Sequence, residues 1–265
     1  MTISKNSTHK NPEAAANKLW LGAKRKGGSA LTPTHVYLTG DTHGSFERIY
    51  EFCQTQQTTR QDLLVILGDA GINYYGSRRD SLLKKILSEL PVTIFCIHGN
   101  HEQRPTPAKG YVEQSFCGGT VLVQPEYPNL LFAVDGEVYD LMGKSCLAIG
   151  GAYSVDKEYR LARGWGWWPD EQPDDAIKAK VESVLERRNW QVDVILSHTC
   201  PLRYEPTEVF LPFIDQSTVD KSTEIWLAKI ESRLHYQRWY CGHYHVTKQV
   251  DNLRLLFEDY LSLGE

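Results

Sequence analysis

The sequence predicts an α/β fold whose strands form either a mixed sheet or a two-sheet sandwich. Three observations lead to this prediction. Short apolar runs end in turns that contain glycine or serine, amphipathic helical patterns lie between these runs, and two further stretches show several short strands with little helix. Strands that alternate with helices are typical of α/β proteins, and the strand-rich stretches indicate antiparallel additions to them.

Five apolar runs have the composition of buried strands, and each is followed directly by a turn with polar side chains. The runs cover residues 35–39, 63–67, 92–97, 192–196 and 238–241. The turns that follow them cover residues 40–44, 68–69, 99–102, 197–198 and 242–245. Short, continuous apolar runs bounded by turn residues are typical of strands that are buried on both faces.

Four segments between the strands place apolar residues at helical spacing. These segments are 46–57, 82–90, 176–188 and 222–234. In the first of them, Phe46, Ile49 and Cys53 fall on one face. Pro91 ends the second, because proline cannot continue a helix. The two strand-rich stretches are 118–149 and 246–257.

Residues 1–33 are polar and differ in composition from the rest of the chain. We expect them to form a mobile N-terminal extension, with one domain over residues 34–265. The alanines at 14–16 favour a short helix over residues 12–21. A mitochondrial transit peptide is the competing interpretation, but Glu13 and the lack of an arginine-rich amphipathic face count against it.

Composition excludes some classes of function. The chain has 265 residues, of which 41% are apolar, enough for a large core. Its net charge of −4 provides no global basic field, so there is no strong nucleic-acid signal, although a local basic patch could still bind a polyanion. No apolar run is long enough to cross a membrane, which predicts a cytoplasmic protein without membrane contact. The six cysteines lack a C-x-x-C pair, so we expect them to be reduced core residues.

The polar side chains in the five turns are of the types that bind metal ions. Carboxyl ends of strands in α/β folds gather at one edge of a sheet, so we expect these side chains to lie together. Carboxylate, amide and imidazole groups without thiolate suit manganese, iron or zinc better than a structural zinc site. The candidate residues are Asp41, His43, Asp69, Asn100, His101, His198, His243 and His245.

Five sequence blocks in this order resemble the calcineurin-like metallophosphoesterase superfamily. The blocks are GDTHG (40–44), GD (68–69), GNHE (99–102), SH (197–198) and GHYH (242–245). One block alone is a weak signal, but five in order after predicted strands are specific, and the resemblance covers about residues 35–257. It implies two packed mixed β-sheets flanked by helices, a catalytic domain over residues 34–265, and hydrolysis of a phosphate ester at two divalent metal ions.

The resemblance also implies roles for individual residues. The first metal ion would be held by Asp41, His43 and His245, and the second by Asn100, His198 and His243. Asp69 would bridge the two ions, and His101 would protonate or stabilise the leaving oxygen. The chemistry is consistent, because a hydroxide shared between two cations about 3.5–4 Å apart is ionised near neutral pH and can attack phosphorus in line.

Two positions depart from the protein Ser/Thr phosphatases of this superfamily. Those enzymes carry a GDxVDRG second block and an arginine just before GNHE. Here the second block continues as residues 70–73, Ala-Gly-Ile-Asn, and His98 stands at the position of the arginine. The phosphate-clamping arginines and the aspartate that orients the catalytic histidine are therefore missing at those positions.

These departures leave several functions open. The leading hypothesis is hydrolysis of a phosphate ester of small or moderate size. A protein Ser/Thr phosphatase and a nucleotide or nucleic-acid phosphodiesterase are alternatives, so the substrate could be a small molecule, a nucleotide or a phosphoprotein. A non-catalytic scaffold of the same fold is the least favoured alternative, because every metal ligand and His101 are present.

The segment 159–169 interleaves arginines, aromatic residues and glycines. One interpretation is a substrate-facing loop in which Arg160 or Arg163 grips the phosphate and a tryptophan stacks on a base. Asn100 would also contact the substrate. The other interpretation is a tryptophan-rich plug that packs against a helix starting near Asp170. The sequence alone does not choose between these two.

Overall fold

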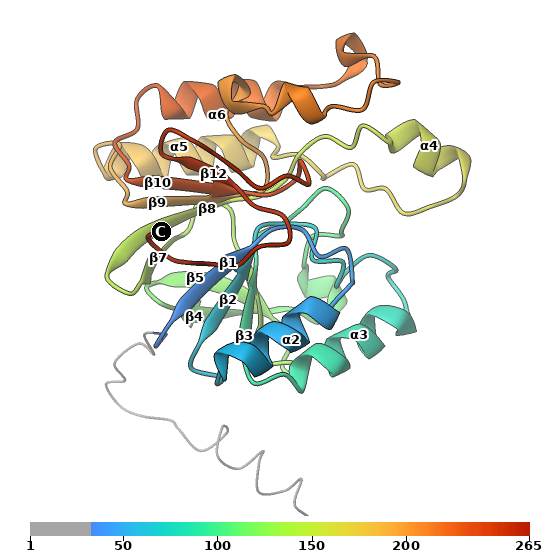
Figure 1. The fold of residues 1–265 in the computed structure, drawn as a ribbon, viewed down its shortest axis with the longest axis vertical. Coiled ribbons are helices and arrows are strands. Elements are labelled where there is room, and N and C mark those ends of the chain that lie inside the picture. Colours follow the sequence, from blue (N-terminus) through green and yellow to red (C-terminus); the bar gives the residue numbers. More distant parts are fainter. Residues whose placement is uncertain (1–32) are drawn as a thin grey trace, which may run out of the picture. The chain divides into compact units, whose positions relative to one another are not determined.

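The computed structural model describes residues 33–265 of the chain. The N-terminal extension expected over residues 1–33, with its helix over residues 12–21, therefore falls almost entirely outside the described residues. The remainder contains two β-sheets that lie face to face, with helices on their outer faces (Figure 1). This arrangement confirms the predicted sandwich of two mixed sheets and excludes the single mixed sheet.

The first sheet contains seven strands within the described part of the chain. In spatial order they are β13 (Leu261–Ser262), β1 (Val36–Thr39), β2 (Leu63–Ile66), β3 (Thr93–Cys96), β6 (Leu130–Ala133), β5 (Gly119–Val123) and β4 (Val112–Phe116). β1, β2, β3 and β6 are parallel, whereas β13 on one side and β5 and β4 on the other are antiparallel to their neighbours.

The second sheet contains six of the described strands. In spatial order they are β11 (Lys248–Val250), β12 (Leu253–Leu255), β10 (Arg238–Cys241), β9 (Val194–Ser197), β8 (Lys144–Ile149) and β7 (Val138–Leu141). The four central strands are parallel and the two edge strands are antiparallel. The antiparallel edges of both sheets come mainly from the two stretches that were predicted to be rich in short strands.

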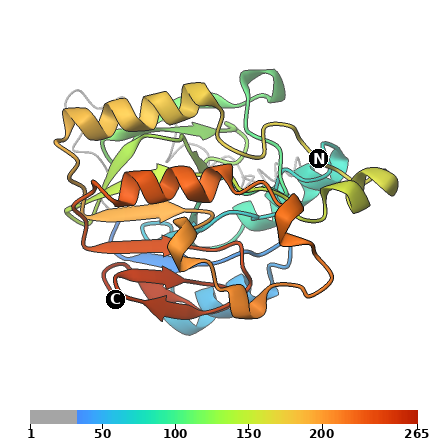
Figure 2. The same cartoon turned by 90° about the horizontal axis from the view of Figure 1, so that it is seen from above.

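Helices cover the outer face of each sheet. On the first sheet these are α2 (Glu47–Gln56) and α3 (Arg78–Ser88), and on the second α5 (Asp175–Arg187) and α6 (Ser222–Glu231), which lie along its strands (Figure 2). The short helix α4 (Lys157–Ala162) projects beside the sheets (Figure 1). Single 3-10 turns complete the described elements at η1 (Pro107–Lys109), η2 (Leu202–Tyr204), η3 (Thr207–Val209) and η4 (Gln216–Thr218).

Three layers of apolar side chains explain why the strands have continuous apolar sequences. On β2, Leu63 and Val65 pack into the core between the sheets, while Leu64 and Ile66 pack against the helices of the first sheet. A strand buried on both faces needs apolar residues at every position. Burial of the described cysteines is consistent with the predicted core role, since all six are buried.

The predicted strands agree with the structure to within two residues at each end, whereas the strands β4 and β13, the helix α4 and the single 3-10 turns were not predicted. β4 is a polar, largely exposed edge strand, so it carries no apolar pattern. β13 has only two residues. α4 lies in the segment interpreted as a loop, where good helix formers extend from Lys157 to Ala162 before the chain turns at Gly164 with φ of 66°. Among the described residues, no helix has the length and apolar character needed to span a membrane.

Candidate metal centre

The five predicted turns meet where the carboxyl ends of strands from both sheets come together. Within the first sheet, the N–H of His43 donates to the carbonyl of Asp69 at 2.8 Å. Between the sheets, the N–H of His243 donates to Asp41 Oδ1 at 2.9 Å, and His198 Nδ1 donates to the carbonyl of Leu67 at 2.8 Å. Residues that follow the strands of each sheet therefore form hydrogen bonds with candidate ligand residues of the other sheet.

The backbone in these turns adopts conformations that few residues tolerate. His43, Asp69, His243 and His245 all have positive φ, between 47° and 69°. Such non-glycine residues are uncommon and concentrate at functional sites, where the surrounding structure must hold them. Two glycines of the blocks leave room for carboxylates, because a Cβ at Gly99 would lie 2.0 Å from Asp69 Oδ1 and one at Gly242 would lie 2.3 Å from Asp41 Oδ1.

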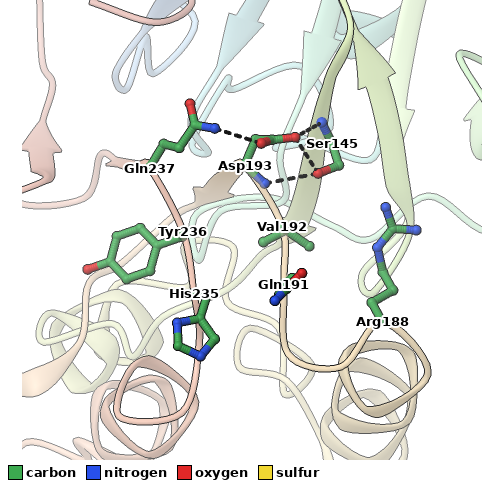
Figure 3. Close-up of a pocket in the computed structure, with 8 residues that line it drawn as sticks. All are labelled: Ser145, Arg188, Gln191, Val192, Asp193, His235, Tyr236 and Gln237. Atoms are coloured by element: carbon green, nitrogen blue, oxygen red, sulfur yellow. Dashed lines mark hydrogen bonds between the residues drawn. The ribbon is translucent and has the colours of Figure 1, made fainter.

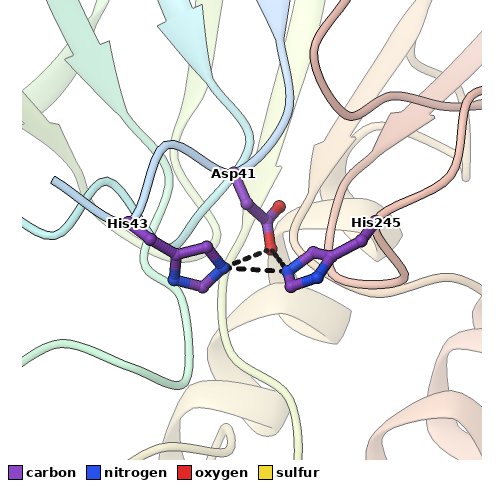
Figure 4. Close-up of side chains that lie close together, drawn as sticks. All are labelled: Asp41, His43 and His245. Atoms are coloured by element: carbon purple, nitrogen blue, oxygen red, sulfur yellow. Dashed lines mark hydrogen bonds and ion pairs between the residues drawn. The ribbon is translucent and has the colours of Figure 1, made fainter. Parts of the chain in front are cut away.

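Asp41, His43 and His245 form what we call the outer group (Figure 4). Asp41 Oδ2 lies 3.7 Å from His43 Nε2 and 3.3 Å from His245 Nε2, and the two imidazole nitrogens are 2.8 Å apart. Asp41 Oδ2 is buried and makes no hydrogen bond with any described residue. A buried carboxylate oxygen without a donor, facing two imidazole nitrogens, fits a cation at this point.

The charges of the outer group favour cation binding. Burial opposes ionisation of Asp41, but the nearby imidazoles of His245, His198 and His43 outweigh it and hold the pKa of Asp41 below its ordinary value. Burial lowers the pKa of His43, so its ring is neutral and offers a lone pair. The close approach of His245 to the Asp41 carboxylate raises the pKa of His245. A divalent cation would take the place of the proton that this histidine attracts.

Asn100, His198 and His243 form what we call the inner group. Since a carbonyl only accepts, the bond to Leu67 puts the proton of neutral His198 on Nδ1 and leaves a lone pair on Nε2. That lone pair faces Asn100 Oδ1 at 2.8 Å, while Asn100 Nδ2 donates to Ser154 Oγ. Two acceptors this close need a cation beside them, either a further proton or a metal ion.

His243 joins the inner group through its ring. Its centroid lies 4.9 Å from that of His198, edge to face. Burial, together with the neighbouring His198, lowers the pKa of His243 to about 3, so the ring is neutral near pH 7. His243 is not a member of the three tightest groups of candidate ligand atoms, which are Asp41–His43–His245, His43–Asp69–His101 and Asp41–Asp69–His198.

Asp69 lies between the outer and inner groups. Its Oδ2 is 3.7 Å from His198 Nε2 and 3.5 Å from His101 Nδ1, and its Oδ1 accepts the backbone N–H of His101 at 2.7 Å. Burial opposes its ionisation, but His198 and His101 outweigh this and lower the pKa of Asp69. Asp69 is thus a buried carboxylate with candidate ligand atoms of both groups within reach, and its bridging of two ions stays a prediction.

His101 is held by two residues whose role the sequence analysis missed or assigned differently. Its Nε2 lies 3.3 Å from Asp156 Oδ1, and its Nδ1 accepts a hydrogen bond from Arg160 Nη2 at 3.0 Å. Arg160 also donates from Nε to Asp156 Oδ2 at 2.8 Å. Burial opposes protonation of His101, but Asp69 and Asp156 outweigh it and raise the pKa of His101. The aspartate that orients the catalytic histidine in protein phosphatases is missing at its usual position in this sequence, and Asp156 supplies a carboxylate from another part of the chain.

A sequence signal for Asp156 existed. The apolar strand over residues 144–149 is followed by Gly150-Gly151 and then by Ser154 and Asp156, which repeats the strand, glycine and polar residue pattern of the five blocks. Burial opposes ionisation of Asp156, but the hydrogen bond from His101 lowers its pKa to about 2, so it is a carboxylate at neutral pH. A sixth turn thus reaches the same site.

The two arginines predicted to contact substrate occupy different positions. Arg160 is buried and, besides Asp156 and His101, it donates to Tyr74 Oη at 3.0 Å and to the carbonyl of Gly166 at 3.2 Å. Arg163 is exposed, and its guanidinium lies 4.6 Å from the centre of the Tyr159 ring. Their contact with a phosphate stays a prediction, as does the substrate contact of Asn100.

A hollow of about 660 Å³ lies at the ends of β9 and β10 that are opposite to the candidate metal ligands (Figure 3). Its walls include Arg188 and residues 191–193 and 235–237 at the starts of these strands, whereas the candidate ligands follow the strands. Asp193 at its edge accepts hydrogen bonds from the N–H and Oγ of Ser145 and from Gln237 Nε2. These bonds give Asp193 a structural role in joining β8 to the loops before β9 and β10.

Comparison with known proteins identifies the family. The family described as calcineurin-like phosphoesterase matches residues 34–247. The protein TT1561 of Thermus thermophilus has 13% identity and a TM-score of 0.49, with 85% of this chain and 89% of that chain covered. A phosphopantetheinyl hydrolase from Mycobacterium tuberculosis has 15% identity and a TM-score of 0.42, with 86% and 89% covered. No curated protein matches the chain significantly. The family match covers most of the sequence and includes all five blocks, so this chain belongs to the calcineurin-like phosphoesterase family.

Proposed function

We propose that this chain is a metal-dependent phosphoesterase that uses two divalent ions, manganese, iron or zinc, to hydrolyse a phosphate ester. The observation that carries the proposal is the placement of Asp69 between two groups of metal-ligand side chains, one of which contains the buried Asp41 Oδ2 facing the imidazole nitrogens of His43 and His245. Asp41, His43 and His245 would hold one ion, and the inner group, Asn100, His198 and His243, would hold the other. When bound, such ions activate water and neutralise phosphoryl oxygens.

His101 supplies the proton for the leaving oxygen in this proposal. Asp69 and Asp156 raise its pKa and so favour the imidazolium that a general acid needs; in that form Nδ1 carries a proton and no longer accepts from Arg160. In the neutral ring, Nε2 donates to Asp156 and Nδ1 accepts from Arg160, so the two side chains fix the plane of the ring. We therefore assign Asp156 and Arg160 as positioning residues that act through His101.

The test is hydrolysis of p-nitrophenyl phosphate and bis-p-nitrophenyl phosphate by metal-stripped protein resupplied with manganese, iron, zinc or magnesium. We expect turnover to return with metal, and the preferred ester separates a monoesterase from a diesterase. Asp69→Asn should lower kcat/KM by about 1,000-fold, equivalent to about 4 kcal/mol of transition-state stabilisation. Asp215→Asn, the same change at an exposed cap of η4, is the matched control.

Two further arms separate the alternatives. A phosphopeptide turned over faster than the aryl esters would favour a protein phosphatase. His101→Ala should lower turnover of an alkyl phosphate more than that of p-nitrophenyl phosphate, because p-nitrophenolate leaves without needing a proton. Metal-independent turnover, or full activity of Asp69→Asn, would refute the proposal.

A further inference from the structure

A hollow of about 630 Å³ is lined by aromatic residues, and Arg160, which contacts His101, is hydrogen-bonded to its wall. Its walls come from two segments, Tyr74–Tyr75 after β2 and residues 164–166 and 168 after α4, together with Gln103. The Tyr74 and Tyr75 rings meet edge to face with centroids 4.9 Å apart, and Tyr74 meets Trp168 edge to face at 5.6 Å. We call this hollow the aromatic pocket. Its volume is in the range of about 300–1,000 Å³ that is usual for small-molecule sites.

Arg160 connects the aromatic pocket to the proposed proton donor. Nη1 of Arg160 donates to Tyr74 Oη and to the carbonyl of Gly166, both in the pocket wall, while Nη2 donates to His101 Nδ1. Gln103 also lies only two residues after His101. One side chain, Arg160, thus contacts both the pocket wall and His101, so a leaving group that takes its proton from His101 would be close to the pocket.

The aromatic surface of the pocket is partly open to solvent. Tyr75 is 40% exposed and Trp165 is 50% exposed. Cations lie close to these rings, because the guanidinium of Arg79 is 3.9 Å from the centre of the Tyr75 ring and that of Arg163 is 5.9 Å from the Trp165 ring. Exposed aromatic faces beside cationic groups suit a planar ligand that carries negative charge.

The pocket also contains a polar group that can form a hydrogen bond to the edge of a planar ligand. The side-chain oxygen of Gln103 accepts from Lys109 Nζ, which fixes the direction of the amide. Its nitrogen Nε2 has no hydrogen-bond partner among the described residues, so it can donate to a ligand. An aryl ring without heteroatoms would not use this donor, whereas a nucleobase would.

We propose that the aromatic pocket binds the base of a nucleotide, so that the substrate class is the nucleoside monophosphates. This proposal rests on the proposed function, because it assigns the leaving group of that same reaction. Hydrolysis breaks the bond between phosphorus and the ester oxygen and forms a bond from phosphorus to the oxygen of water. The nucleoside oxygen takes a proton from protonated His101, and the proton that water loses restores the protonated ring. The products are a nucleoside and inorganic phosphate.

The kinetic test compares two monoesters in the metal-loaded enzyme, adenosine 5′-monophosphate and glycerol 3-phosphate. We expect the nucleotide to have the higher kcat/KM, and Trp165→Ala to lower the ratio of the two values about tenfold, which corresponds to losing one stacking contact of about 1.4 kcal/mol. Trp165→Phe should keep most of the ratio, because the aromatic face remains. Phe213→Ala removes an aromatic residue that is 76% exposed elsewhere and is the matched control.

A binding measurement separates failure of this proposal from failure of the proposed function. Adenosine 5′-monophosphate is titrated into metal-loaded protein by calorimetry, with glycerol 3-phosphate and phosphotyrosine as comparisons. Weaker nucleotide binding in Trp165→Ala supports the pocket even if no ester is turned over. Hydrolysis with a ratio that Trp165→Ala does not change overturns the pocket and leaves the phosphoesterase proposal standing. Phosphotyrosine binding more tightly than the nucleotide also overturns the assignment of a nucleobase.

Discussion

The outer and inner groups of the candidate metal centre contain similar types of side chain but are built differently. In the outer group, the side chains of His43 and His245 are 34% and 48% exposed, while the side chain of His198 in the inner group is 0% exposed. The inner group is also fixed from outside, by Leu67 on His198 and by Ser154 on Asn100. The outer histidines contact mainly each other and Asp41. Hydrogen-bond partners that hold a ligand side chain in place raise metal affinity, so we expect the ion of the inner group to be held more tightly.

A buried polar network adds to the support of the inner group. Thr199 Oγ1, next in sequence to His198, donates to Glu224 Oε1 at 2.7 Å and lies 3.0 Å from Tyr244 Oη. Tyr244 is next to His243 in the GHYH block. In the outer group, the comparable support is the stacking of the His245 ring on the Phe257 ring, whose centroids are 4.7 Å apart. The difference between the groups can therefore be tested by removing either ligands or supports.

Removal of one histidine from each group should give the largest contrast. We expect His198→Ala to reduce bound metal from two ions to one or none and to lower kcat/KM by about 1,000-fold, because a buried ligand is lost. It should also lower the unfolding midpoint in chelator, since it leaves a cavity and an unpaired carbonyl of Leu67. His245→Ala should weaken one ion only and be partly rescued by added metal. Metal analysis, kinetics and thermal unfolding provide the measurements, and equal losses in both variants would contradict the comparison.

The pH dependence of stability should show the buried network. Burial raises the pKa of Glu224 to about 7, above its ordinary value of about 4.5. The folded protein therefore keeps a proton that the unfolded chain releases, so this contribution to stability is complete below pH 4.5 and is lost as the pH rises through 7. The glutamine of Glu224→Gln stays neutral at every pH. The unfolding free energy of the variant minus that of the wild type should therefore increase by about 3 kcal/mol between pH 4.5 and pH 8.

Urea unfolding of both proteins across this pH range, in the presence of chelator, measures how this difference in unfolding free energy changes with pH. Glu51→Gln on the exposed face of α2 is the matched control for the change of charge. A constant difference between wild type and Glu224→Gln at all pH values would show that Glu224 does not hold the proton.

Removal of a single hydrogen-bond partner of an inner-group residue should give the smallest effect. Ser154→Ala deletes the acceptor of Asn100 Nδ2, and we expect the affinity of the inner ion to fall about tenfold while the outer ion is unchanged. Ser183→Ala, which deletes an exposed acceptor of Arg187 on α5, is the matched control. Calorimetric metal titration resolves the two ions, and a loss confined to the weaker ion would reverse the assignment of inner and outer affinities.

The sequence by itself determined the strands that carry the site and the ligand types that follow them. Strand and turn signals are local, because a run such as Leu63–Ile66 is buried on both faces and is followed at once by Gly68 and Asp69. The order of the blocks also identified the family. None of these inferences required knowledge of which strands are neighbours.

The tertiary structure alone decided what surrounds those ligands. The bonds from His243 to Asp41 and from His198 to Leu67 cross between two sheets, so no local pattern encodes them. Likewise, Asp156 reaches His101, and Tyr74 forms a pocket wall with Trp168, only because distant segments fold together. Such contacts depend on strand order and loop path, which arise from packing of the whole core. The candidate residues of the centre could thus be named from the sequence, but their supports and the aromatic pocket could not.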